Sequence, residues 1–450
     1  MLNQHEASPK PLSQEQEVWL RRAWDQIDEE ELARLIVDMV NIPSPPGEEK
    51  GLAKFMVEWM ATAGLDAFYQ EIDPDQGNAI GYFRGSGGGP TLLLWGELDM
   101  FLGMAQEERF GLGSVSRREL QSKATREGEY IIGLGADNPK GHAACAAMAL
   151  KAVIKAAVPL KGTVILGLPA GGMPTNSWDP ENTRKNVAQG VGCEYMLQQG
   201  IYPDFAIAAK PVYAVSWEEA GLCWFKIGVK GNCAYTGTRH MLPYKNSIVD
   251  AAKVIQGLEE WFPEYARRNA SGNVAPQAQI GAIEGGRAYK PSLCPEICNL
   301  YLDLRVAPGM HPMDAKRQLE EALSGIQARH PELDLDCEMI LSIPGTRTEP
   351  SNWIVESCIR GWEYVEQKKH KHEVAHSGAT DVNIIRAHGI PVARLGTPPF
   401  QLPGGMRQDL LSWMGTASTV NLARLVKCYI YSVIDTCTRS IEEVGLATKR

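Results

Sequence analysis

The sequence predicts an α/β protein with a mainly parallel sheet flanked by helices, interrupted by a smaller inserted α+β domain. Short apolar runs bounded by turn residues, such as Thr91–Trp95 and Thr163–Leu168, alternate with helical patterns such as residues 141–157. This alternation is typical of parallel strands that helices bury on both faces. From about residue 220 the order changes to strand, helix, strand, strand, helix, strand. That order is the ferredoxin-like split unit.

The predicted α/β domain comes in two segments, residues 1–219 and residues 344–450, and the ferredoxin-like domain is expected at residues 220–343. In the first segment, apolar residues recur at helical spacing over residues 16–41 and predict one or two amphipathic helices. The further elements expected along the chain are a helix at 51–63, strands at 205–209, 222–229, 277–283, 298–306, 333–340 and 392–395, and helices at 247–261 and 312–329.

Composition restricts the classes of partner. The formal net charge is −9 without a basic patch, which disfavours a nucleic acid or an anionic membrane. The first 16 residues lack the apolar core of a secretory signal, and no apolar run approaches the ~20 residues that span a bilayer. Ten scattered cysteines without a CxxC pair indicate reduced, mostly buried thiols. We therefore expect a cytoplasmic protein with a small-molecule substrate.

Four segments together resemble one known family of enzymes. They are GLGADNPKGHAACAAMALKAV at residues 133–153, GNCAYTGTRHMLPYKNSIVDA at 231–251, EICNLYLDLRVAPGM at 296–310 and SGATDVNIIRAHGIPVARLG at 377–396. The chain is similar to the two-zinc aminoacylase, carboxypeptidase and deacetylase family, which includes acetylornithine deacetylase and glutamate carboxypeptidase. The resemblance implies a catalytic α/β domain with an inserted lid, a homodimer or higher homo-oligomer, and C–N bond hydrolysis by two zinc ions that a bridging Asp joins.

Position by position, most of the family's metal ligands are replaced. The family's H-x-D motif is Glu97-Leu98-Asp99 here, so Glu97 stands for the metal His while Asp99, which normally orients that His, is kept. The bridging Asp matches Asp137, and the carboxylate of the Gly-Glu-Pro element is Lys210. The tandem Glu pair is missing, since the stretch PAGGMPT follows the third strand, and residues 397–413 contain no His but include Gln408 and Asp409.

These departures predict that no metal is tightly bound. The alternative is one divalent ion (Zn, Mn or Mg) held by Glu97 and Asp137. Lys210 has three interpretations: a salt bridge that fills the vacated metal cavity, a binder of a substrate carboxylate, or an acid–base group. His142 is expected to be a hydrogen-bonded histidine at a helix start.

The resemblance supplies further candidates in the inserted domain and beside it. Tyr235 stands where many relatives have the lid His that serves as an oxyanion donor in the partner's site, and His240 lies nearer the Asn; we assign the donor role to His240, with Tyr235 as its neighbour. Asn246 and Arg305 match positions that frame the substrate. An Arg305–Asp303 pair is the structural alternative. Glu218 and His376 are weaker candidates for substrate binding. For Glu218 an ordinary surface carboxylate is the favoured interpretation, and His376 precedes the S-G-x-T-D segment. His370 and His372 lie in KKHKH, interpreted as a solvated charged run.

Three functions remain open from the sequence. The first is an enzyme related to metallo-amidohydrolases that acts on a small carboxylated amide or amine, with a reduced or absent metal site; its candidate catalytic groups are Glu97, Asp99, Asp137, Lys210 and His240. The second is a metal-independent lyase, decarboxylase or isomerase in the same pocket. The third is a catalytically inactive homologue that binds a ligand or a partner.

Overall fold

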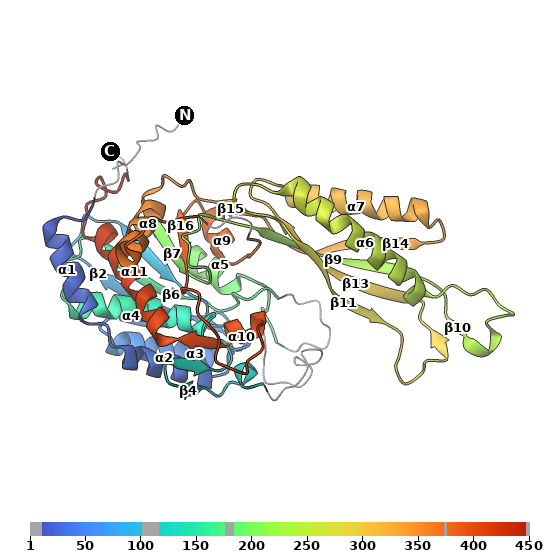
Figure 1. Cartoon of the computed structure of the whole chain (residues 1–450), viewed down its shortest axis with the longest axis horizontal. Helices are drawn as coiled ribbons and strands as arrows, with labels where there is room; N and C mark the ends of the chain where they lie inside the picture. Colours follow the sequence, from blue (N-terminus) through green and yellow to red (C-terminus); the bar gives the residue numbers. More distant parts are fainter. Residues whose placement is uncertain (1–10, 101–116, 176–183, 373–375, 447–450) are drawn as a thin grey trace. The chain divides into compact units, whose positions relative to one another are not determined.

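The computed structural model describes residues 11–100, 117–175, 184–372 and 376–446, and the chain divides into two compact units (Figure 1). The first unit comprises Met1–Trp217, Thr348–His372 and Thr380–Arg450. The second comprises Glu218–Arg347 and Glu373–Ala379. The second unit therefore begins and ends within a few residues of the insertion expected at 220–343, and a short later segment joins it.

The first unit is built on a six-stranded mixed sheet. Its strands lie in the order β1-β2-β6-β3-β7-β16. The four strands β6, β3, β7 and β16 run parallel, whereas β1 and β2 form an antiparallel hairpin at the edge, and β2 is antiparallel to β6. The bounds are β1 (Asp66–Glu71), β2 (Gly77–Arg84), β3 (Thr91–Trp95), β6 (Thr163–Leu168), β7 (Phe205–Ala209) and β16 (Val392–Leu395). The mainly parallel sheet is confirmed, and the edge hairpin adds to the prediction.

Helices cover both faces of this sheet, as the apolar strands require. Alternate residues of β3 belong to two different cores: Leu92 and Leu94 pack with the cluster that includes α4 and α11, whereas Leu93 and Trp95 pack with α5 and α9. The helices are α1 (Gln14–Trp24), α2 (Glu29–Asn41), α3 (Lys50–Thr62), α4 (Lys140–Lys155), α5 (Val191–Gln198), α8 (Trp353–Glu366), α9 (Val382–Ala387), α10 (Leu410–Met414) and α11 (Thr419–Cys437).

Local sequence explains where these helices begin. Ser13 and Gln16 form a capping box at α1, and Asp28 accepts the Glu31 amide at the start of α2. A small antiparallel sheet, β17-β5-β4, completes the unit beside a short 3-10 turn. These last elements are β4 (Thr125–Glu127), β5 (Tyr130–Ile132), β17 (Thr416–Ser418) and η2 (Arg118–Leu120).

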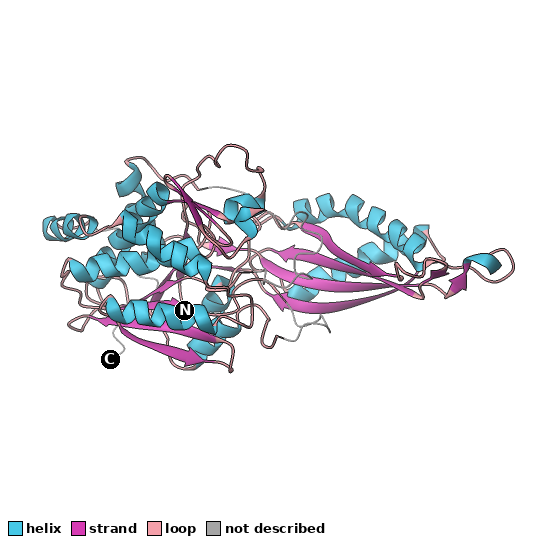
Figure 2. Cartoon of the chain, turned by 90° about the horizontal axis from the view of Figure 1, so that it is seen from below, coloured by secondary structure: helices cyan, strands magenta, loops and turns pink. Residues whose placement is uncertain are grey.

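The second unit has the predicted order of strand, helix, strand, strand, helix, strand. Its sheet has the order β11-β13-β9-β14, and α6 and α7 pack against it (Figure 2). Alternate residues of β13 are buried, which gives the sheet one core face. The elements are β8 (Glu218–Glu219), β9 (Gly221–Lys230), β10 (Ala234–Tyr235), η3 (Thr236–Thr238), α6 (Ser247–Asn269), β11 (Ala278–Gly285), β12 (Leu293–Cys294), β13 (Ile297–Val306), α7 (Pro312–Arg329), β14 (Asp334–Ile343) and β15 (Thr346–Arg347).

Two expectations from the composition concern the cysteines and membrane-spanning segments. The ten cysteines are all free, and seven of them are buried. In the part of the chain that the structure describes, no helix is both long and apolar enough to cross a membrane.

Candidate functional site

The candidate site lies in the first unit, at the carboxyl ends of its parallel strands. Glu97 follows β3 by two residues, Lys210 follows β7 directly, and Thr397 follows β16 by two residues. Because parallel strands end at the same edge of a sheet, these side chains converge there, where α/β sheets commonly bind ligands. The loop before α4 adds Asp137 and Asn138 to the same edge.

A buried ion pair between Lys210 and Glu97 is the main feature of the site. The Lys210 ammonium contacts Glu97 Oε2 and lies 3.3 Å from Asn138 Oδ1. The two charged side chains are 5% and 0% exposed. Of the interpretations open for Lys210, the salt bridge is therefore the one that the structure contains. Removing either partner would leave a buried charge without its counter-ion, which costs about 3–5 kcal/mol in comparable cases.

Asp137 is held through Thr397 and His142. The Thr397 hydroxyl donates to Asp137 Oδ1 at 3.0 Å, and the Thr397 amide N–H donates to His142 Nε2 at 3.2 Å. His142 Nδ1 lies 2.6 Å from the carbonyl oxygen of Asp137, so the neutral tautomer with hydrogen on Nδ1 satisfies both ring nitrogens. His142 is therefore a fully hydrogen-bonded histidine at the helix start, as expected.

Burial shapes the protonation of this group. It raises the pKa of Asp137 to about 7, against the opposing hydrogen bond from Thr397. Burial also lowers the pKa of His142 to about 3, so the imidazole is neutral at pH 7. Asp137 thus has the acidity of a group that can both accept and release a proton near neutrality.

Asp99 has a different role from the expected one. Its carboxylate accepts the amide N–H groups of Gly172 at 2.7 Å and Met173 at 2.8 Å, and the neighbouring Gly171 amide donates to Glu49 Oε1 at 2.9 Å. Asp99 and Glu49 therefore hold the loop after β6 by its backbone. Both of its oxygens accept backbone amides of the loop, and a catalytic role for Asp99 stays a prediction.

The missing tandem Glu pair has a steric counterpart. A Cβ atom on Gly172 would lie 2.2 Å from Glu97 Cγ and 2.5 Å from Glu97 Cδ. The side chain of Glu97 thus occupies the space into which a larger residue at position 172 would project. Glycine at this position is required as long as Glu97 points towards Lys210.

Two buried carboxylates near the ion pair were not among the predicted site residues. Burial raises the pKa of Glu49 to about 8, and the nearby charge of Asp99 adds to this. Burial likewise raises the pKa of Asp381, with contributions from the charges of Glu97 and Asp99. Asp381 ends the S-G-x-T-D segment, so the motif itself was the signal that could have identified it; Glu49 has no comparable motif.

Glu218 and Arg305, both in the second unit, are engaged in structural contacts. Glu218 is 3% exposed and accepts the Asn273 amide at 2.5 Å, so the favoured interpretation as a surface carboxylate is wrong, whereas its role in binding a substrate stays a prediction. Arg305 pairs with Asp303 at 2.9 Å and donates to the Ser377 carbonyl at 3.3 Å. The structural alternative stated for Arg305 is therefore the one observed.

Asn246 and His376 also serve the fold of the second unit. The Asn246 side chain accepts the Ile248 amide at 2.9 Å and caps α6, and its role in framing a substrate stays a prediction. His376 forms a parallel bridge with Val274, and its carbonyl accepts the Ala275 amide at 3.1 Å. These backbone contacts fix the segment and give His376 no demonstrated role in binding.

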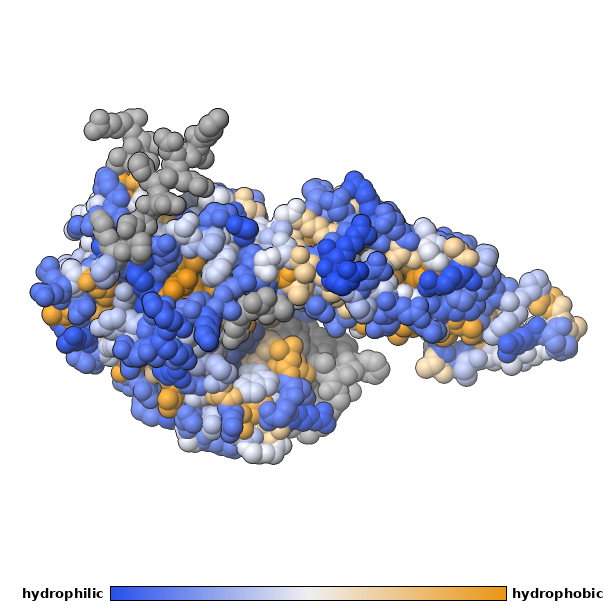
Figure 3. Space-filling view, turned by 45° about the horizontal axis from the view of Figure 1, so that its top comes forward, coloured by the Kyte–Doolittle hydropathy of each residue, from blue (hydrophilic) through white to orange (hydrophobic). Residues whose placement is uncertain are grey.

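Tyr235 and His240 lie on an exposed segment at the end of the second unit that carries β10. Tyr235 is 51% exposed, and Met241 and Leu242, which follow His240, are 71% and 61% exposed. Figure 3 shows hydrophobic side chains at the surface of this end of the unit.

The neighbourhood expected to hold a distal metal His is used by an ion pair. Asp409 Oδ1 and Oδ2 accept two hydrogen bonds from Arg117, each at 2.9 Å, and Asp409 also caps α10. The Arg117 guanidinium holds the pKa of the Asp409 carboxyl well below its usual range. Both carboxylate oxygens of Asp409 therefore accept hydrogen bonds from Arg117.

A two-zinc centre does not fit the side chains at these strand ends. An ammonium stands where the resemblance places a metal carboxylate, Glu97 is paired with it, and Asp99 accepts two amides. Among residues 11–100, 117–175, 184–372 and 376–446, no three His, Cys, Asp or Glu side chains converge to hold a metal ion. No metal-dependent step is therefore assigned to these residues.

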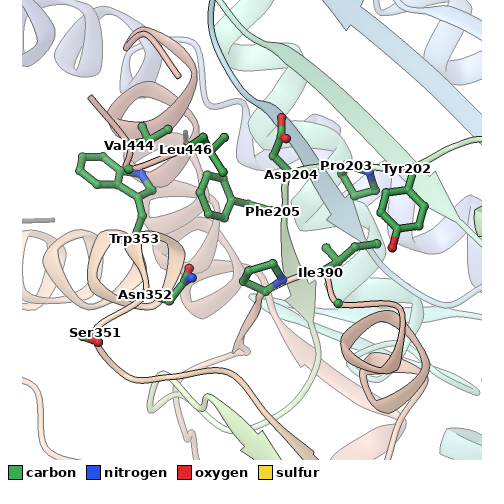
Figure 4. Close-up of a pocket in the computed structure, with 13 residues that line it drawn as sticks. Tyr202, Pro203, Asp204, Phe205, Ser351, Asn352, Trp353, Ile390, Val444 and Leu446 are labelled. Carbon is green, nitrogen blue, oxygen red and sulfur yellow. The ribbon is translucent and has the colours of Figure 1, made fainter. Parts of the chain in front are cut away.

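A separate cavity of about 410 Å³ lies at the opposite end of β7 (Figure 4). Phe205, the first residue of β7, lines it together with Trp353 and Ile390, whereas Lys210 follows the last residue of that strand. Asp204 at its edge accepts the Thr91 amide at 2.7 Å. This cavity is therefore distinct from the Lys210 site.

Comparison with known proteins finds a family for most of the second unit and a similar protein over two thirds of the chain. Residues 218–331 match the family described as a peptidase dimerisation domain. A LysW-lysine hydrolase of Deinococcus radiodurans is 24% identical over 309 residues, which cover 67% of this chain and 72% of that protein.

Solved structures share the fold over nearly the whole chain. Human carnosine dipeptidase 1 superposes with a TM-score of 0.68 at 12% identity, covering 95% of this chain and 100% of that one. A metallo-carboxypeptidase from Sulfolobus solfataricus superposes with a TM-score of 0.65 at 13% identity, covering 92% and 100%. At this identity the likeness concerns the fold.

Proposed function

We propose that this chain is a member of the two-zinc aminoacylase, carboxypeptidase and deacetylase family, because it carries a peptidase dimerisation domain and shares its fold with a dipeptidase and a metallo-carboxypeptidase. In this proposal it is an enzyme that hydrolyses a C–N bond in a small carboxylated amide without a two-zinc centre. Its relatives in sequence and structure are hydrolases. The substrate class and the altered site are the new elements of the proposal.

One observation carries this proposal: a fixed ammonium, Lys210, lies at the same edge of the sheet as Asp137, a buried carboxyl group whose pKa burial raises to about 7. Lys210 reaches Asn138, the residue after Asp137, so the cation and the carboxyl group share one edge of the sheet. In this proposal Asp137 takes a proton from the attacking water and returns it to the leaving nitrogen. Lys210 supplies positive charge to the oxygen that becomes negative in the transition state.

Glu97 and Thr397 act through these two groups. Glu97 fixes the ammonium, and Thr397 fixes the Asp137 carboxyl group by its hydroxyl. A buried and polarised set of this kind is more typical of a functional site than of a decayed one, in which apolar residues would fill the space.

We further propose that the protein is a homodimer in which the segment around His240 serves the other copy. The matched family is named for dimerisation, and the exposed Tyr235, Met241 and Leu242 offer an apolar surface for a second chain. In the resemblance, the lid His donates a hydrogen bond in the partner's site, and His240 is the residue that we assign to this role.

The proposal is tested with purified protein, metal analysis and a panel of N-acyl amino acids and dipeptides. We expect turnover that persists after chelator treatment, with incorporation of one oxygen from labelled water, and a loss of at least 100-fold in Lys210→Met. Lys155→Met is the matched control, because Lys155 is half-exposed at the end of α4, and it should keep full activity.

Three other results would each replace the proposal. Stoichiometric zinc with chelator-sensitive hydrolysis would restore the ordinary two-metal chemistry of the family. Turnover without incorporation of labelled oxygen would favour a lyase, decarboxylase or isomerase. If no compound is turned over but some raise the melting temperature of wild type and not of Lys210→Met, the chain is a binding protein.

A further inference from the structure

The backbone directly after Lys210 adopts a conformation that its residue disfavours. Val212 has a φ of +89°. Of the four described residues other than glycine with positive φ, Val212 is the β-branched one, and a β-branched side chain makes this conformation sterically unfavourable. Strain of this kind persists only where surrounding contacts impose it, and it is concentrated at functional sites.

The contacts that impose it come from the end of β16. The Pro211 carbonyl oxygen accepts hydrogen bonds from Arg394 Nε at 3.1 Å and Arg394 Nη2 at 2.8 Å. The Val212 carbonyl accepts the Gly396 amide at 2.9 Å. Two successive carbonyl groups are thus tied to one strand end, so the turn cannot relax to negative φ without losing these bonds.

Close packing leaves little freedom at Lys210 itself. A Cβ atom on Gly396 would lie 2.1 Å from the Lys210 carbonyl oxygen, so the end of β16 lies flush against the backbone of Lys210. Arg394 is 6% exposed, and its backbone N–H donates to the Ser216 carbonyl at 2.8 Å. The clamp is therefore itself anchored.

We infer that the strained turn at Val212, clamped by Arg394 and Gly396, is a positioning device that holds the Lys210 ammonium against Glu97. Arg394 and Val212 are positioning residues, because they act on Lys210 through the backbone and not on a reacting group. The next residue along β16's exit, Thr397, binds Asp137. The same strand end thus positions both halves of the site.

The placement of Lys210 is measurable without a substrate. We would treat the folded protein with acetic anhydride and follow acetylation of Lys210 by mass spectrometry, relative to the half-exposed Lys155 in the same sample. In wild type Lys210 should react slowly. Arg394→Met releases the clamp, and we expect acetylation of Lys210 to rise at least tenfold with Lys155 unchanged.

The strain argument makes a second, opposite prediction. Without the clamp, Val212 leaves the left-handed region, whereas glycine can stay there at no steric cost. The double variant Val212→Gly/Arg394→Met should therefore protect Lys210 better than Arg394→Met does, by at least threefold. A merely structural role of Arg394 would give no such rescue. Arg394→Lys, which keeps one donor, should give an intermediate rate and replaces Arg394→Met if that variant fails to fold.

The inference is overturned if Lys210 stays as protected in the folded Arg394 variants as in wild type, or if Val212→Gly gives no rescue. Its consequence for turnover rests on the proposed function, and the two fail separately. Acetylation as predicted with no turnover of any amide would retain the positioning device and reject the enzyme. If turnover depends on Lys210 but acetylation of Lys210 does not change in the Arg394 variants, the enzyme is retained and the positioning device is rejected.

Discussion

The ion pair between Lys210 and Glu97 makes a quantitative prediction about stability. Lys210→Met removes the ammonium and leaves a carboxylate that is 0% exposed without its counter-ion, which should lower the free energy of unfolding by about 3–5 kcal/mol. The double variant Glu97→Met/Lys210→Met removes both charges and puts side chains of similar length in their place. It should be close to wild type or more stable, because well-packed apolar residues often replace a buried pair without loss.

The measurement is a double-mutant cycle by urea unfolding at pH 7. It compares wild type, the two single variants and the double variant. We expect a coupling energy of about 3 kcal/mol or more. Lys161 and Glu443 form a matched surface pair, 3.9 Å apart with side chains 48% and 40% exposed, and the same cycle there should give about 0–1 kcal/mol.

A coupling energy in the buried pair no larger than in the surface pair would refute the reasoning. It would mean that Glu97 is protonated or otherwise neutralised when Lys210 is absent, so the ammonium would not be the group that balances the buried charge. If added zinc or manganese stabilised wild type as strongly as it stabilised the variants, the Lys210 ammonium would not be what keeps a metal ion away from Glu97. That result would also count against the ammonium as the group that balances the buried charge.

Three further predictions follow from other contacts. Gly172→Ala should lower the free energy of unfolding by about 1–3 kcal/mol, measured in urea, because its Cβ would overlap Glu97. Burial lowers the pKa of Lys140 to about 7 from its usual 10.5. Between these two pH values the unfolded state binds more protons than the folded state, so the free energy of unfolding rises with pH. From pH 7 to 9 the free energy of unfolding of wild type should increase by about 2 kcal/mol relative to that of Lys140→Met. Met241→Glu should shift the protein towards monomer in analytical ultracentrifugation, since Met241 is 71% exposed on the segment assigned to the dimer, and an unchanged sedimentation coefficient would count against that assignment.

Local sequence was sufficient for most of the framework. The strands Thr163–Leu168, Phe205–Ala209 and Val392–Leu395 were predicted with the observed bounds, since a continuous apolar run ended by turn residues has few other solutions. The edge strand Asp66–Glu71 was not predicted, because half-exposed edge strands lack that apolar signal, and α6 extends eight residues beyond the expected end at 261 through Pro263.

The site was predictable only where a residue follows a recognisable strand. Lys210 and Asp137 were found because motifs place them at strand and helix ends. Glu49 was missed because it reaches the loop after β6 only through tertiary packing. His370 shows the opposite error: KKHKH was interpreted as solvated, yet His370 packs edge-on against Trp362 at 5.1 Å between ring centroids and accepts the Val215 amide at 2.8 Å.

The departures from the metal-binding pattern depend on one another. Glu97 needs the ammonium of Lys210 to compensate its buried charge, and it needs glycine at 172 to leave room for its side chain. A carboxylate at 210 alone would place a second buried negative charge next to Glu97. A glutamate at 172 alone would overlap the side chain of Glu97. Single reversions are therefore each unfavourable, and rebuilding a metal centre would need simultaneous replacement at 97, 172 and 210 together with the distal His that residues 397–413 lack. Packing and electrostatics therefore link residues 97, 172 and 210 to one another, whereas ligands that were lost independently would show no such dependence.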